Sequence, residues 1–292
     1  MPTIKDYNRK ISSLKNTSKI TKTMKMVSAS KLRKAQETQR LAKDFAHEVN
    51  QLIHRIGGHV ENDMHPLLQA SDEVKKVLVV LYTSDKGLCG GFNNNIIRYA
   101  EKYLEERKDD GISYELAFIG KRGYMHFRKR ETVYRYFDQI PSAAPHSKDA
   151  SKVTRHLEKA FLHEGFDRVL LLCNEFISPL SQIPRLHSLL PLEPVDMPDE
   201  PLESATPDEQ ILAEPEMSHL LEFLVPRLVT FKVYYALLEN TAGEHGARMT
   251  AMDNATTNAA NLIDENTLLR NRARQAAITT ELIEIISGAE AL

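Results

Sequence analysis

The N-terminal segment restricts the fold of this chain more than any other feature, because its pattern is that of one very long helix. Proline is absent from Thr3 to Ile56, and the first glycine is Gly57. Its apolar residues recur largely at steps of three and four, as in the seam of a coiled coil. They are Ile4, Tyr7, Ile11, Leu14, Met24, Val27, Phe45, Val49, Leu52 and Ile56. A helix of about 50 residues is roughly 75 Å long, so it needs a partner along its length.

The C-terminal region from Met217 to Ile286 supplies a second long helical pattern. Its apolar residues are also spaced by threes and fours: Leu224, Leu228, Phe231, Tyr235, Leu238, Met249, Met252, Ala259 and Ile263. Pro226 stands near the start of the pattern, where proline is better tolerated. The two patterns predict a long antiparallel coiled coil of the N- and C-terminal helices.

The segment 74–192 reads as an α/β domain. Strands are predicted at 77–82, 114–119, 133–137 and 169–173, with a further edge strand at 185–190, and helices at 94–106, 123–129 and 148–163. Alternating strands and helices imply a parallel sheet with right-handed crossovers. The predicted fold class is therefore α/β, with a Rossmann-like domain added to the coiled coil.

An acidic, proline-rich linker separates this domain from the C-terminal helix. Six prolines and nine acidic residues lie between Leu190 and Met217, without a lysine or arginine. Such a composition favours an extended, solvated connection. The predicted parts are a long helix over 1–58, the α/β domain over 74–192, the linker over 193–216 and a second long helix over 217–292.

Composition argues against a chain that is basic as a whole, a membrane-spanning protein, a disulfide-stabilised protein and a zinc-binding protein. The net charge is only −2, and no apolar run approaches the roughly 18–20 residues that span a bilayer. Two cysteines, Cys89 and Cys173, form neither a disulfide framework nor a zinc-ligand pattern. Cys89 could be a nucleophile with His126, His156 or His163 as its base, but no motif places these histidines, so a structural thiol is favoured.

The first helix is strongly basic along its N-terminal part. Ten lysines and arginines precede Gln36, opposed by Asp6 alone. A solvated helix face is one interpretation; an acidic partner is another, either nucleic acid, anionic lipid or an acidic protein surface. Nucleic acid is the least favoured partner, because the stretch offers only Tyr7 for stacking.

The loop 83–93 lies where doubly wound folds bind phosphates, between a strand and a helix. Its sequence matches neither G-x-G-x-x-G nor G-x-x-x-x-G-K-[ST], and Lys86 precedes its glycines. A tight turn that requires glycine backbone angles is therefore favoured. The alternative is a Rossmann-fold enzyme with a nucleotide site at this loop and a helical arm for oligomerisation.

Four segments together resemble the ATP synthase gamma family, in order and across essentially the whole chain. They are KITKTMKMVSASKL at 19–32, TSDKGLCGGFN at 83–93, EHGARMTAMDN at 244–254 and NRARQAAITTELIEIISGA at 271–289. The resemblance implies a rotor whose coiled coil is a shaft inside three alpha and three beta subunits, and whose foot stands on the c-ring beside the epsilon subunit. It implies a non-catalytic subunit without a cofactor or metal of its own and without nucleic acid as a partner. It also implies a peripheral protein, with indirect membrane contact, at the cytoplasmic face of a bacterial plasma membrane.

Particular residues follow from the same resemblance. Met24 and Lys25, with Lys22 nearby, match the part of the shaft that faces acidic loops of the beta subunits. Positions that engage the catalytic ring or stabilise the helix pair are matched by Arg248, Arg274, Gln275, Thr279 and Glu281. Glu214 and Pro215 resemble the region near the c-ring. Arg270 departs from the family, which commonly has an aromatic residue there.

Overall fold

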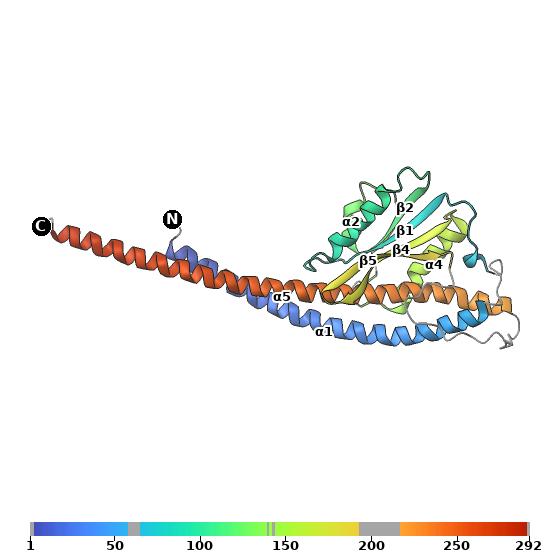
Figure 1. Ribbon diagram of the computed structural model, residues 1–292, viewed down its shortest axis with the longest axis horizontal. Helices are drawn as coiled ribbons and strands as arrows, with labels where there is room; N and C mark the ends of the chain where they lie inside the picture. The colour runs from blue at the N-terminus through green and yellow to red at the C-terminus, as the bar shows by residue number, and fades with distance from the viewer. Residues whose placement is uncertain (1–2, 58–64, 139, 142–143, 193–216, 291–292) are drawn as a thin grey trace. The chain divides into compact units, whose positions relative to one another are not determined.

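The computed structural model describes residues 3–57, 65–138, 140–141, 144–192 and 217–290. The chain forms two compact units. One contains the residues up to Ala29 together with those from Arg248 onward, and the other runs from Ser30 to Ala247. Two long helices contribute to both units: α1 (Ile4–Gly57) and α5 (Met217–Glu290). Both predicted terminal helices are thus confirmed (Figure 1).

The larger unit contains a five-stranded sheet in the order β3-β2-β1-β4-β5. Its strands are β1 (Lys76–Tyr82), β2 (Ser113–Ile119), β3 (Val133–Phe137), β4 (Arg168–Ser178) and β5 (Ser181–Leu190). The first four are parallel, as predicted, and β5 returns antiparallel to β4. The remaining elements are the short 3₁₀ helix η1 (Pro66–Leu68), α2 (Phe92–Glu105), α3 (Lys121–Phe127) and α4 (Ser147–His163).

The apolar run of β1 is explained by burial on both faces of the sheet. Leu78 and Val80 belong to a core that includes residues of α4, whereas Val79 and Leu81 belong to a second core with residues of α2. Successive side chains of a strand point to opposite faces, so a strand covered on both sides is apolar at every position.

The first half of α5 is part of the larger unit rather than a free-standing helix. Leu221, Val225, Val229 and Val233 are buried in the same core as α4 and one face of the sheet. In Figure 1 this stretch of α5 runs below β4 and β5. Pro226 lies inside the helix, within its first turns. Among the described helices, none has an apolar stretch suited to crossing a bilayer.

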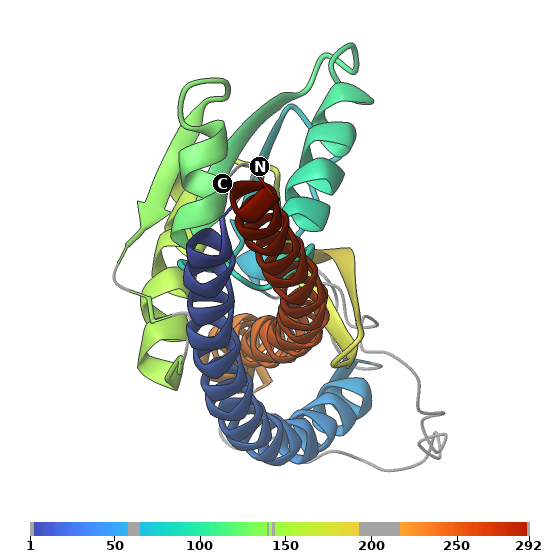
Figure 2. The ribbon, with the colours of Figure 1, turned by 90° about the vertical axis from the view of Figure 1, so that its left-hand side faces the viewer.

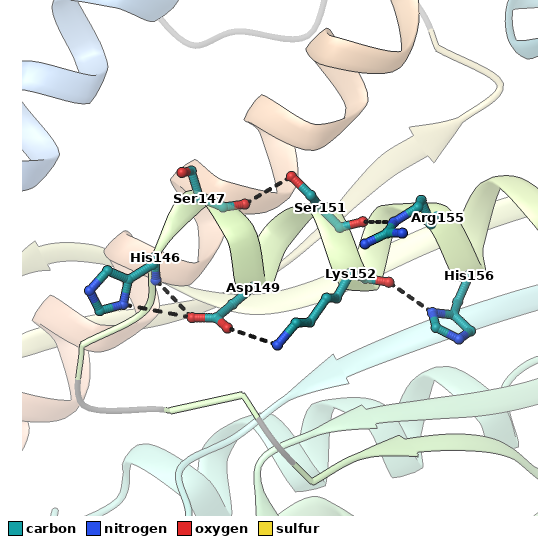
Figure 3. Close-up of polar contacts among 7 residues, drawn as sticks. All are labelled: His146, Ser147, Asp149, Ser151, Lys152, Arg155 and His156. Atoms are coloured by element: carbon teal, nitrogen blue, oxygen red, sulfur yellow. Dashed lines mark hydrogen bonds and ion pairs between the residues drawn. The ribbon is translucent and has the colours of Figure 1, made fainter.

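The start of α4 is stabilised by its own side chains (Figure 3). The carboxylate of Asp149, a buried residue in the first turn, accepts a hydrogen bond of 3.0 Å from the backbone N–H of His146. Lys152 Nζ lies 3.9 Å from the other oxygen of the same carboxylate. A negative charge at this end also complements the helix dipole.

The turn after β2 requires glycine at position 120. Gly120 has φ +89, and a Cβ atom there would lie 1.9 Å from the carbonyl oxygen of Thr83. Thr83 is itself fixed, because its N–H donates to Ile119 and its hydroxyl accepts from the N–H of Gly123 at 2.9 Å.

Replacement of Gly120 by alanine should therefore lower the free energy of unfolding of the full-length chain by more than about 3 kcal/mol, because strain and a backbone clash add. Gly111→Ala is the matched control: Gly111 has φ +72, but its Cβ would meet nothing within 4 Å. The control should cost only about 1–2 kcal/mol. Denaturant unfolding measures both, and equal losses would show that the close contact with Thr83 is unimportant.

Candidate functional site: the paired helix ends

The smaller unit consists of the first part of α1 and the second part of α5, here called the paired helix ends (residues 3–29 and 248–290). Three contacts fix their pairing. Thr21 Oγ1 lies 2.7 Å from Thr256 Oγ1, Lys25 Nζ lies 2.6 Å from Asp253 Oδ1, and Arg270 Nη1 donates to Asn8 Oδ1 at 3.5 Å. Descending numbers in α1 meet ascending numbers in α5, so the helices are antiparallel (Figure 2).

The residues at the seam of this pair follow a strict heptad spacing. On α1 the positions that follow this spacing are Ile4, Tyr7, Ile11, Leu14, Ser18, Thr21, Lys25 and Ser28, all buried or partly buried, and Met24 and Ala29 beside them are partly buried as well. On α5 they include Met249, Met252, Thr256, Ala259, Ile263, Asn266 and Arg270. The spacing alternates between three and four, as coiled coils require.

After Leu14 the α1 side of the seam is polar rather than apolar, whereas the α5 side keeps Met249 and Met252. Ser28 is 3% exposed, whereas its neighbour Val27 is 50% exposed. Val27 was expected to mark the helical repeat, and it instead faces outward. Small side chains let two helices approach closely, which a row of leucines would prevent.

The threonine pair shows how the seam satisfies its hydroxyl groups. Thr21 Oγ1 also lies 3.1 Å from the carbonyl oxygen of Ser18, and Thr256 Oγ1 lies 2.7 Å from that of Met252. Each hydroxyl has a single proton to donate. One threonine therefore donates across the pair while the other donates to its own helix, and the two arrangements can exchange without moving either backbone.

Asn266 places an amide in the seam, where it is 1% exposed. Its Nδ2 donates to the carbonyl oxygen of Leu262 at 2.6 Å, whereas its Oδ1 has no hydrogen-bond partner among the described residues. A single buried polar residue of this kind lowers stability but disfavours other registers of a helix pair.

The eight residues proposed to contact a partner all lie in this unit, but in different surroundings. Lys22 is exposed, while Met24, Lys25 and Arg248 are partly buried. Arg274, Gln275, Thr279 and Glu281 are exposed on α5. Glu214 and Pro215 lie outside the described residues. At Arg270 the departure from the family is accommodated by polar contacts, with Asn8 and with Asn271 Oδ1 at 3.2 Å.

The charged surface of this unit is mostly open to solvent. The lysines and arginines of α1 up to Lys22 are exposed, and Lys25 is drawn into the ion pair with Asp253. The side chains of that pair are 41% and 52% exposed, so the pair is expected to contribute only about 0–1 kcal/mol.

Sequence reasoning missed an apolar stripe at the end of α5. Its members are exposed by half or more: Ile278, Leu282, Ile283, Ile285 and Ile286. Most of them are three or four residues apart, so they share one face of the helix. They follow Arg270, the last residue of α5 with a described hydrogen bond to α1. The regular spacing of aliphatic residues was the signal in the sequence.

In the larger unit, the loop after β1 is held by a compact polar network. The backbone N–H of Ser84 donates to Asn93 Oδ1 at 2.9 Å, and Asn93 Nδ2 lies 3.2 Å from Cys89 Sγ. Of the histidines considered as bases for Cys89, His126 bonds to Glu101 and His156 to the carbonyl of Lys152. The buried Cys89 thiol is therefore part of the polar network that holds the loop after β1.

Helix α5 contacts the sheet and the start of α2 beside this loop, near the strand ends where doubly wound folds bind nucleotides. Asn174 Nδ2 donates to the carbonyl oxygen of Phe92, and the N–H of Asn174 donates to Asn240 Oδ1, both at 3.3 Å. A Cβ on Gly243 would lie 3.0 Å from the Phe92 ring. Helix α5 thus packs closely against the start of α2.

Comparisons with known proteins agree with this architecture. The sequence profile of a family described as ATP synthase matches residues 3–292. The ATP synthase gamma chain of Trichlorobacter lovleyi is 41% identical over 292 residues, covering 100% of this chain and 99% of the relative. That of Pelagibacter ubique is 37% identical over 296 residues, covering 100% of both.

Solved structures share the fold at lower sequence identity. The rotor of the Euglena gracilis mitochondrial ATP synthase matches with a TM-score of 0.66 and 21% identity, over 94% of this chain and 98% of that chain. The central stalk and c-ring structure of the Tetrahymena thermophila mitochondrial ATP synthase matches with a TM-score of 0.57 and 24% identity, over 81% of this chain and 99% of that chain.

A double-mutant cycle with Lys25→Ala and Asp253→Ala should give a coupling free energy of at most about 1 kcal/mol, because both side chains are solvated. The coupling should fall further in 1 M salt, because the Debye length is then only about 3 Å and exposed charges are strongly screened. Denaturant unfolding of the full-length variants measures it. A coupling above about 2 kcal/mol that persists in salt would contradict this view of the pair.

Proposed function

We propose, since this chain belongs to the ATP synthase gamma-chain family, that it is the central rotor subunit of an F-type ATP synthase. In this role it couples proton-driven rotation of the c-ring to conformational change in the alpha and beta subunits, and so to ATP synthesis. The chain is a non-catalytic subunit, and the nucleotide sites lie on other subunits.

The observation that supports this role best is the apolar surface of the paired helix ends. Besides the stripe at the end of α5, the side chains of Ile20, Met26, Val27 and Leu268 are each exposed by half or more. A unit of two helices cannot cover such residues itself, and exposed apolar patches mark interaction sites. A surrounding ring of alpha and beta subunits would cover them from all sides.

The basic surface of α1 suits weak contacts with acidic loops of the beta subunits. Lys22 is exposed and available for such contacts, while Lys25 must share its charge with Asp253. Exposed ion pairs contribute about 0–1 kcal/mol each. Contacts of this strength can form and release at every step of rotation, whereas buried ion pairs would trap the rotor.

The packing of α5 beside the loop after β1 supports a coupling role over the Rossmann-enzyme alternative. Asn174 links Phe92 at the start of α2 to Asn240 of α5, near the strand ends where a nucleotide would be expected. A ligand there would have to displace α5 from the buried core, which a bound cofactor does not normally do.

The remaining assignments extend the same proposal. The α/β domain at 74–192 would form the foot, contacting the epsilon subunit and the c-ring, with Glu214 and Pro215 of the linker at 193–216 nearby. The helices at 1–58 and 217–292 would form the shaft. Membrane contact would be indirect, at the cytoplasmic face of a bacterial plasma membrane.

Co-purification with the matching alpha and beta subunits tests the role directly. One copy of this chain per three alpha and three beta subunits is expected, with ATPase activity on the same peak that depends on the chain. Nucleotide binding or turnover by the chain alone, without assembly, would instead favour the enzyme alternative.

Charge reversal at Lys22 should slow ATP hydrolysis by the assembled complex several-fold without preventing assembly, because one weak contact becomes a repulsion of about 1 kcal/mol. The matched control is Lys129→Glu, an exposed lysine in the larger unit just after α3. Steady-state ATPase assays on purified complexes give the comparison. Equal rates for the two variants would remove Lys22 from the contact surface.

A further inference from the structure

A cavity of about 100 Å³ lies within the larger unit, between α5 and the β4–β5 pair. Its apolar walls include Leu171 and Leu189 of the sheet and Phe231 and Ala236 of the helix. Figure 1 shows this part of α5 running beside β4 and β5. Protein interiors are normally close-packed, so an apolar space of this size beside a charged group is unusual.

Glu239 brings a carboxylate into this apolar space. Burial raises the pKa of the Glu239 carboxyl to about 7, the charge of Glu175 adds to the rise, and a hydrogen bond from the backbone of Phe176 opposes it. A carboxyl group in such surroundings pays a desolvation cost whenever it ionises, and a cation in contact with it would remove much of that cost.

Among the described charged groups of the lining, Glu175 is the one whose charge acts on the Glu239 carboxyl. Glu175 lies on the same side and is paired with Arg185 at 2.8 Å between Nε and Oε2. Lys232 also lines the cavity, but it precedes Glu239 by two helical turns, or about 10 Å along the axis. His187 lines the strand side, and Tyr235 has its hydroxyl near Gln39 of α1, at 3.5 Å.

We propose that this cavity binds a small organic cation with a branched or cyclic apolar body, with its ammonium group on Glu239 and its body between Leu171, Phe231 and Ala236. The site offers what ligand pockets generally offer, an apolar enclosure with few polar groups placed at one end. A cavity near 150 Å³ holds benzene, which has six carbon atoms. The smaller volume here, about 100 Å³, limits the apolar body of the ligand to about four or five carbon atoms.

Three isosteric probes test the charge of the occupant: isobutylammonium, isobutanol and isobutyrate, each titrated into the full-length chain at pH 8. Saturation-transfer NMR of the probe methyl groups reports binding. Isobutylammonium should bind with a dissociation constant in the millimolar range, roughly fivefold or more tighter than isobutanol. Equal binding of the alcohol, tighter binding of isobutyrate, or no binding of any probe would overturn the proposal.

Glu239→Gln keeps the shape of the side chain and removes its charge. This variant should lose the preference for isobutylammonium over isobutanol. Glu101→Gln, which removes a partly exposed carboxylate on α2 that does not line the cavity, should retain it. Thermal unfolding of both variants checks that they fold. If neither substitution changes the preference, Glu239 is not the counter-ion and the proposal fails.

The pH dependence of isobutylammonium binding distinguishes an effect of the Glu239 charge from an effect of the His187 charge. Below pH 7 the Glu239 carboxyl holds its proton, while an alkylammonium with a pKa near 10 stays charged. Binding should therefore weaken about tenfold or more from pH 8 to pH 5.5. Protonation of His187 would act in the same direction. A decline that persists in Glu239→Gln would assign the titration to His187 and overturn the role given to Glu239.

Discussion

The covering of two very long helices is the constraint on which the rest of this structure depends. A helix of 74 residues, such as α5, cannot be stable on propensity alone, so each stretch needs a surface to pack against. Its first half is buried in the core of the α/β unit, and its second half pairs with α1. Its last turns present isoleucines and leucines that no described part of the chain covers. The helix therefore requires a partner at its end.

The burial of α5 also decides what the α/β unit can do. The strand order and the parallel pairing match a nucleotide-binding half of a doubly wound fold. Near the place where such folds bind a nucleotide, Asn174 bonds instead to the Phe92 carbonyl and to Asn240 of α5. In this chain the α/β sheet packs against the first half of α5, and its fold alone does not indicate nucleotide binding. Function must be argued from a site and not from a fold.

Long, regular elements were predictable from the sequence, whereas the seam between the helices was only partly so. Burial on both faces made β1 apolar from Val77 to Tyr82, and the lack of proline and glycine revealed α1. The seam of α1 was followed correctly from Ile4 to Leu14 and then missed, because its next positions are serine, threonine and lysine. Hydrophobic periodicity then pointed to Met24, which is partly buried beside Lys25, and to Val27, which is exposed beside the buried Ser28. Small residues that allow close approach carry no hydrophobic signal.

The same property that hid the seam bears on how a rotating shaft would work. Where α1 contributes serine, threonine and lysine to the seam, less apolar surface is buried within the pair, and residues such as Ile20 and Val27 face outward. The free energy of apolar contact is non-directional and grows with the buried area. Surrounding subunits could therefore move past such a surface without breaking specific hydrogen bonds. Exposed lysines add weak contacts that set preferred angles. The pair therefore combines a seam that is partly polar with an exterior that is partly apolar, and this combination suits a helix pair whose main partner surrounds it.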